Sequence, residues 1–248
     1  MISSIWNSAV YQPLYNLLML LVDVLPGHSV GAAIIVLTIV VKLVLYPLTA
    51  KSILAQREMK KLQPELQKLK DKHKDDKKKL AEHTMALYQE KGVTPFSGCL
   101  PMLVQIPIVI GLYWVFSRGL KLHTVDVGIL YSFVKAPLSL DMHFLFFDLA
   151  GKSLILAICA GIAQYFQTDI SLGQQAPIPK KTGKEQGTFQ EDFARSMQVQ
   201  MRYVLPVMIS FIAFTTSAAV ALYWATSNIL SIVQELLLKS KSNKNKLS

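Results

Sequence analysis

The sequence predicts an all-α polytopic membrane protein with five transmembrane helices, a cytoplasmic helical hairpin and an N-terminal interfacial helix. Of its 248 residues, 52% are hydrophobic, and the mean hydropathy is +0.35. The apolar residues occur in blocks long enough to cross a bilayer, which takes about 20 residues in a helix. Alternating strands of about ten residues, which a membrane β-barrel requires, do not appear.

The first apolar block, residues 30–50, contains a lysine near its middle. Lys42 has no acidic residue within the span to pair with, and a lysine at that depth costs about 2.5–3.5 kcal/mol on insertion scales. The alternative is that Lys42 reaches the nearer interface, but Ala50 lies about 12 Å further along a helix, beyond what the side-chain stem covers. We therefore expect Lys42 to face water inside the membrane.

Residues 1–29 precede this span and have an amphipathic pattern. Apolar positions such as Leu14 and Leu18 are interrupted by polar ones, among them Asp23. The pattern favours a helix that lies in the membrane interface, followed by a turn at Pro26-Gly27. No basic residue precedes the apolar run, so we expect no signal peptide and no transit peptide.

Residues 51–94 are polar and are predicted to form the cytoplasmic hairpin of two short antiparallel helices. Apolar residues recur there at intervals of three and four, which is typical of a helix that buries one face. A charge run at residues 73–79 suits the tip, and Pro64 is expected to start or kink the first helix. The alternative is a solvated spacer. The apolar positions are Met59, Leu62, Leu66 and Leu69, then Leu80, Leu87 and Tyr88.

The later apolar blocks predict four further spans. Two prolines, Pro101 and Pro107, should bend the second span, and the third has Gln164 and Gln167 on one face. The last block is too long for one helix, so we expect a hairpin that turns near residues 215–218. The predicted segments are the second span 95–117, an extracytoplasmic loop 118–152 whose apolar run 144–147 touches the interface, the third span 153–169, a cytoplasmic loop 170–200, the fourth and fifth spans 201–238, and a basic cytoplasmic tail 239–248.

The placement of basic residues predicts the topology. Residues 51–91 contain 12 lysines and arginines, residues 168–202 contain 5, and the chain after Leu238 contains 4. Residues 118–152 contain 4, and the first 29 residues contain none. Because basic residues accumulate on the cytoplasmic side, we expect the N-terminus outside and the C-terminus in the cytoplasm. The net charge of +10 then needs no nucleic-acid partner.

No pattern of a catalytic, metal or cofactor site occurs, so we expect no enzyme, no metal and no cofactor. The two cysteines lie in apolar blocks and are expected to be small core residues. The polar side chains of the spans could instead line one cavity with a single cation, which would ease a short polar or acidic peptide into the bilayer. These side chains are Thr38, Lys42, Gln105, Gln164, Gln167, Ser227 and Asn228.

Four segments together resemble the YidC/Oxa/Alb family of membrane protein insertases. They are KLVLYPLT after the span with the basic residue, MKKLQPELQKLK, TPFSGCLPMLVQIPIVIGLYWVF and ALYWATSNILSIVQ. The similarity covers the chain from about Val30 to Leu238, and from it we expect a short bacterial member without the large extracytoplasmic domain of some relatives.

The resemblance implies a hydrophilic groove between the five spans, open to the cytoplasm and to lipid. The basic residue of that groove, usually arginine in the family, corresponds to Lys42. The polar residue of the third span corresponds to Gln167 or Gln164, and the aromatic residue of the last span to Trp224. The candidate groove residues are thus Lys42, Thr38, Gln105, Gln164, Gln167, Tyr223, Trp224 and Ser227, and those of the hairpin that captures substrate are Leu62, Pro64, Leu66, Leu69 and Leu80.

The function that this implies is insertion and folding of nascent membrane proteins in the bacterial plasma (inner) membrane. The expected partners are nascent membrane-protein substrates and the lipid bilayer, with a translocon and the ribosome as further candidates. Two alternatives use the same residues differently. One is a conduit for a small solute or ion through the polar cavity, and the other is an assembly subunit that would tolerate the loss of Lys42.

Overall fold

A computed structural model describes residues 6–73, 76–93, 100–119, 125–172 and 196–244. Within these ranges the chain is mostly helical, and its two strands have two residues each. Three helices are long and apolar enough to cross a membrane, at Val30–Lys61, Leu154–Leu172 and Ser196–Thr215. The predicted all-α polytopic membrane class is confirmed.

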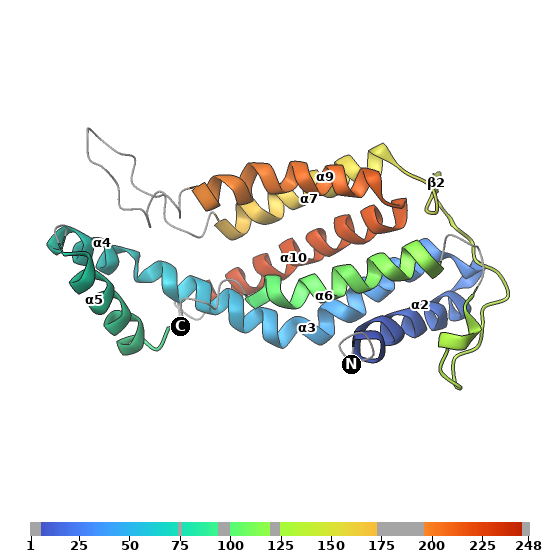
Figure 1. Cartoon of the computed structure of the whole chain (residues 1–248), viewed down its shortest axis with the longest axis horizontal. Coiled ribbons are helices and arrows are strands. Elements are labelled where there is room, and N and C mark those ends of the chain that lie inside the picture. Colours follow the sequence, from blue (N-terminus) through green and yellow to red (C-terminus); the bar gives the residue numbers. More distant parts are fainter. Residues whose placement is uncertain (1–5, 74–75, 94–99, 120–124, 173–195, 245–248) are drawn as a thin grey trace.

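The helix α3 (Val30–Lys61) extends through the bundle and beyond it (Figure 1). Ser29 caps its first turn, with the Ser29 Oγ accepting from the Ala32 amide at 3.4 Å. The helix continues through Pro47 and past residue 50, so the first span and the start of the predicted hairpin segment are one helix. Two lysines, Lys60 and Lys61, lie in its last turn, where cations are favoured by the helix dipole.

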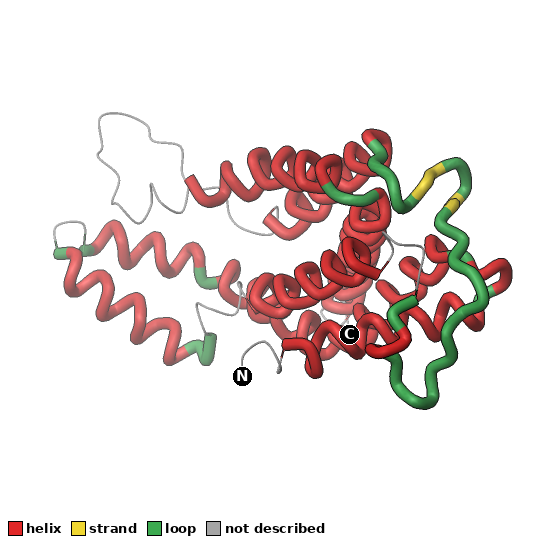
Figure 2. The backbone as a smooth tube through the Cα atoms, turned by 45° about the vertical axis from the view of Figure 1, so that its right-hand side comes forward, coloured by secondary structure: helices red, strands yellow, loops and turns green. Residues whose placement is uncertain are grey.

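Beyond α3 the chain folds back as two helices, α4 (Gln63–Lys72) and α5 (Lys77–Glu90), which protrude from one end of the bundle (Figures 1 and 2). Pro64 lies in the first turn of α4, where a missing amide proton costs no hydrogen bond. The Asp76 carboxylate caps α5 by accepting from the Lys79 amide at 3.0 Å.

The Asp76 cap should make the stability of α5 depend on pH. Its hydrogen bond from the Lys79 amide lowers the pKa of Asp76 below its ordinary value. The stabilisation is therefore fully present above the unfolded-state pKa and is lost as the pH falls through the lowered folded-state pKa. In hydrogen exchange at acidic pH, amides of α5 should lose protection in the wild type. In Asp76→Asn, whose cap does not titrate, that loss should be absent; an equal loss in both would contradict the cap's role.

Four further helical segments complete the bundle: α6 (Leu100–Trp114), α7 (Leu154–Leu172), α9 (Leu205–Thr215) and α10 (Ala218–Lys244). The π-helix η4 (Val115–Gly119) continues α6, and the π-helix η6 (Gln200–Val204) leads into α9. Figure 1 shows α10 between α3 on one side and the α7–α9 pair on the other. The chain turns between Thr215 and Ala218.

Gly161 allows α7 and α9 to approach closely. A Cβ at this position would overlap the Ser210 Oγ and lie 3.0 Å from the Pro206 carbonyl oxygen. Small residues permit such close packing between helices in membranes. Gly161→Leu should therefore lower the unfolding free energy in detergent by about 1–3 kcal/mol, whereas Ile162→Leu, at the exposed neighbouring position, should have little effect. Equal stability of the two variants would show that α7 and α9 can separate without cost.

At the opposite end from α4 and α5, the N-terminal helix α2 (Gln12–Val24) packs along α3. The π-helix η1 (Asn7–Tyr11) precedes it, and the short helix η2 (Pro26–His28) turns the chain, with Gly27 at φ 73°. One face of α2 is completely buried, including Tyr15, Leu18 and Met19. The position of this helix relative to a membrane surface stays a prediction.

A long loop crosses that end of the bundle, with the short helix η5 (Val127–Ile129) and the strands β1 (His143–Phe144) and β2 (Phe147–Asp148). Asn16 of α2 holds the loop: its Nδ2 donates to the Ile129 carbonyl at 3.0 Å, and its Oδ1 accepts from the Tyr131 amide at 2.6 Å.

The expectation that both cysteines are core residues is wrong for Cys159, which is exposed on α7. Cys99 lies outside the described residues.

Candidate functional site

The polar side chains of α10 lie on one face of the helix, at spacings of three, four and one residue. This periodicity places them on the side that packs against α3 and α7. Four of them are less than a tenth exposed: Ser227 (3%), Asn228 (8%), Gln234 (9%) and Glu235 (4%). Buried polar groups of this kind need hydrogen-bond partners, and the partners lie on α3 and α7.

Lys42 of α3 points at α10. Its Nζ donates to the Ser231 Oγ at 2.7 Å, and the Ser231 hydroxyl donates to the Ser227 carbonyl at 2.9 Å. In the described part of the chain, no carboxylate forms an ion pair with Lys42. Its neighbours Leu43 and Val44 are 65% and 70% exposed, so the lysine is on the inner side of a helix whose other side faces outward.

The two glutamines of α7 belong to a second polar chain. The Asn228 Nδ2 donates to the Gln164 Oε1 at 3.0 Å, which joins α10 to α7. The Gln164 Nε2 donates to Thr168 Oγ1 at 3.0 Å and contacts the Gln167 Oε1 at 3.3 Å. The Gln167 Nε2 then donates to the Ser171 Oγ at 3.1 Å. The structure thus brings Gln164 and Gln167 together.

This chain ends at a buried acid that sequence reasoning missed. The Ser171 Oγ donates to the Glu235 Oε2 at 2.7 Å, and the Arg57 Nη2 of α3 donates to the Glu235 carbonyl at 3.1 Å. The adjacent Gln234 Nε2 donates to the Thr49 Oγ1 of α3 at 2.7 Å. Gln234 and Glu235 therefore tie α3 and α7 to α10 near the hairpin end. The available signal was that Glu235 is the single acidic residue between Tyr203 and Leu238.

Two of the remaining predicted groove residues, Gln105 and Tyr223, meet nearer the other end of α10. The Gln105 Nε2 of α6 donates to the Tyr223 hydroxyl at 2.7 Å, and Trp224 is partly buried against the core. Thr38 is 1% exposed, and its hydroxyl donates to the Ile34 carbonyl of its own helix at 2.6 Å. Thr38 thus lines the interior without joining the polar chain.

Two of the five predicted hairpin residues are buried. Leu62 and Leu66 are 6% and 8% exposed, whereas Leu69 and Leu80 are half-buried and Pro64 is exposed. The Lys91 Nζ lies 3.7 Å from the Glu65 Oε2 and links the end of α5 to the start of α4. Leu62 and Leu66 are therefore not an open surface in this structure, and a role in substrate capture stays a prediction.

The fold and this interior network define a multi-pass all-α membrane protein with polar groups held between its helices. Over the described ranges, no three histidine, cysteine or acidic side chains are placed to hold a metal ion. The chain belongs to the 60Kd inner membrane protein family, whose model matches residues 21–246, and the predicted YidC/Oxa/Alb resemblance is confirmed.

Three curated relatives illustrate the similarity, and each is called "Membrane protein insertase YidC". The protein of Francisella philomiragia is 35% identical over 210 residues. Those of Francisella tularensis subsp. novicida and of Francisella tularensis subsp. tularensis are each 34% identical over 210 residues. In every case the alignment covers 84% of this chain and 32% of the relative. The chain thus matches about a third of the length of these relatives.

Proposed function

We propose that this chain is a membrane protein insertase and chaperone of the bacterial inner membrane. The observation that supports it best is Lys42, a cation inside the bundle whose hydrogen bond is to the neutral Ser231 hydroxyl, at 2.7 Å. A lysine held in this way retains its attraction for an anion. An acidic side chain of an incoming peptide can take the place of the serine, because a charge-assisted pair is stronger than a hydrogen bond to a neutral group.

The polar faces of α10 and α7 would form the wall of a hydrophilic groove. Gln164, Gln167 and Asn228 offer amide groups that can exchange their mutual hydrogen bonds for bonds to a peptide backbone. Such exchange reduces the free-energy cost of moving an unpaired backbone group from water into lipid. A short polar tail of the substrate would enter this groove, and Lys42 would attract its acidic residues.

The apolar segment of the substrate supplies the driving force. As the tail enters the groove, this segment leaves water and enters lipid along the exposed outer sides of α7 and α10. Burial of apolar surface contributes about 25 cal/mol per Å². The chain itself performs no covalent chemistry in this scheme, so it acts as an insertase and not as an enzyme.

The charge distribution supports an orientation for this process. With α4 and α5 in the cytoplasm, the loop between α6 and α7 and the N-terminus lie outside, and the C-terminus lies inside, as the positive-inside rule predicts. The hairpin would then be the first element that a nascent substrate meets. A translocon and the ribosome are further proposed partners.

An assay in vesicles tests the proposal. Purified protein is reconstituted, and a single-span substrate with an acidic N-terminal tail is synthesised in its presence. Protection of the tail from external protease reports insertion. We expect protection well above that of empty vesicles and no flux of small ions or solutes without substrate. Flux without substrate, together with no protection, would favour the conduit function instead.

A further inference from the structure

The loop at the end of the bundle opposite the hairpin is held by the helices beneath it. Asp141 bonds to both sides of the start of α3: its carbonyl accepts from the Val30 amide at 2.9 Å, and its amide donates to the His28 carbonyl at 3.1 Å. The Ala218 amide at the start of α10 donates to the Gly151 carbonyl at 2.8 Å. Phe144 packs directly over Gly31, where a Cβ would overlap its ring.

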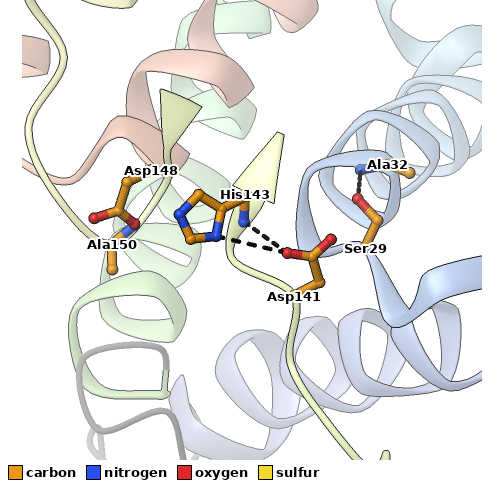
Figure 3. A network of polar contacts seen from close by, with 6 residues as sticks. All are labelled: Ser29, Ala32, Asp141, His143, Asp148 and Ala150. Atoms are coloured by element: carbon orange, nitrogen blue, oxygen red, sulfur yellow. Dashed lines mark hydrogen bonds and ion pairs between the residues drawn. The ribbon is translucent and has the colours of Figure 1, made fainter. Parts of the chain in front are cut away.

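Figure 3 shows the polar contacts that shape the β1–β2 turn. The Asp141 carboxylate accepts from the His143 amide at 3.0 Å, and the Asp148 carboxylate accepts from the Ala150 amide at 3.0 Å. The loop therefore has a defined conformation, which fixes the direction of its outward-facing side chains.

Several of those side chains are large, apolar and exposed. In the apolar run 144–147, Phe144 and Phe147 pack against the core, whereas the two residues at the tip face outward. The outer loops of soluble proteins rarely expose this many large apolar side chains without a partner. The exposed residues are Val127 (68%), Phe133 (75%), Leu138 (93%), Leu145 (78%) and Phe146 (78%).

The surroundings of this patch favour lipid as the partner. Eight residues after Phe146 the chain reaches Leu154 and Ile155, which begin the membrane-crossing helix α7 and are 58% and 59% exposed. Lys135 and Lys152 are exposed between and beside these apolar residues. Apolar side chains flanked by lysines suit the boundary between acyl chains and phosphate headgroups.

We propose that the outer loop, through Phe133, Leu138, Leu145 and Phe146, inserts into the outer leaflet and anchors this end of the bundle in the headgroup–acyl boundary. The anchor rests on the chain crossing the membrane and not on the insertase function. Because the loop is hydrogen-bonded to the first residues of both α3 and α10, its insertion fixes the depth of these two helices, and with them the depth of Lys42 and Ser231.

Site-specific fluorescence tests the anchor. The full chain with Cys99→Ser and Cys159→Ser receives a single cysteine, Leu138→Cys or Phe146→Cys, and is labelled with the environment-sensitive dye NBD. The matched control is Met85→Cys on α5, an apolar side chain that is 53% exposed at the other end of the molecule. Each variant is reconstituted in phosphatidylcholine–phosphatidylglycerol vesicles, and its unfolding temperature checks the fold.

We expect labels at 138 and 146 to emit at shorter wavelength than the label at 85. Phosphatidylcholine with a doxyl group on its acyl chain should quench them at least about twofold more than the control, and aqueous iodide should quench them less. Equal iodide quenching at all three sites would overturn the proposal. Shielding of 138 and 146 from both quenchers would also overturn it, because it would show a protein surface covering the patch.

Discussion

Lys42→Glu is expected to reduce insertion of a single-span substrate with an acidic tail by about tenfold or more, which corresponds to at least about 1.4 kcal/mol. The substitution places a like charge where the tail would approach, inside a bundle where charges are screened less than in bulk water. Lys42→Ala should cause a smaller loss, because it removes attraction without adding repulsion. Lys42→Arg should retain activity, since a guanidinium keeps the charge and can pair with a carboxylate at two points.

Two comparisons make the Lys42 result specific. A substrate whose tail has no acidic residue should respond weakly to all three variants. Leu43→Ala is the matched protein control, because Leu43 lies next to Lys42 and is 65% exposed on the outer side of α3; it should insert the acidic substrate like the wild type. If the four proteins with lysine, arginine, alanine or glutamate at position 42 insert it equally, Lys42 is not the centre of the mechanism and an assembly role gains support.

Glu235→Ala is expected to have the largest effect on stability among single substitutions of the polar network. Glu235 is 4% exposed and accepts the Ser171 hydroxyl at 2.7 Å. Its removal leaves the Ser171 hydroxyl without that partner and creates a gap between α10 and α7. A hydrogen bond to a charged group contributes about 1.5–3 kcal/mol, so we expect a loss of that size in unfolding free energy.

Denaturant unfolding in detergent, followed by circular dichroism, measures this loss. Glu235→Gln keeps the side-chain volume and an oxygen that can accept from Ser171, so it should be destabilised by less than the alanine variant. Leu236→Ala is a matched control at the next position, where the side chain is 49% exposed. A stability of Glu235→Ala equal to that of the wild type would show that the contacts of Glu235 do not hold α10 to α7.

Local patterns predict the helices of this protein well. A block of apolar residues that crosses the bilayer forms a helix, because in lipid each backbone N–H and C=O group needs a hydrogen bond within the protein. The intervals of three and four residues in the segment of Leu62 and Leu66 likewise specify helices that bury one face. Lys42 could be recognised as unusual from its position alone, since the cost of a charge in the bilayer centre does not depend on the fold.

Contacts between distant segments could not be predicted in the same way. The bonds from Ser171 and Arg57 to Glu235 join residues 64 and 178 positions apart, and no local pattern shows that they meet. The continuation of α3 past residue 50 was missed because a change from apolar to polar residues marks the membrane boundary and not a helix end. In the run 144–147, Phe144 packs over Gly31 whereas Phe146 is exposed, and no local pattern distinguishes the two.

A reversal of charges on both partners tests the central claim most directly. The acidic residues of the substrate tail are replaced by lysines, and this substrate and the original are each presented to wild-type protein and to Lys42→Glu in vesicles without a membrane potential. The account predicts a crossed pattern, in which Lys42→Glu inserts the basic-tailed substrate better than the wild type does and the acidic-tailed one worse. If Lys42→Glu lowers insertion of both substrates equally, the charge at position 42 does not act on the tail, and the proposed role of Lys42 is contradicted.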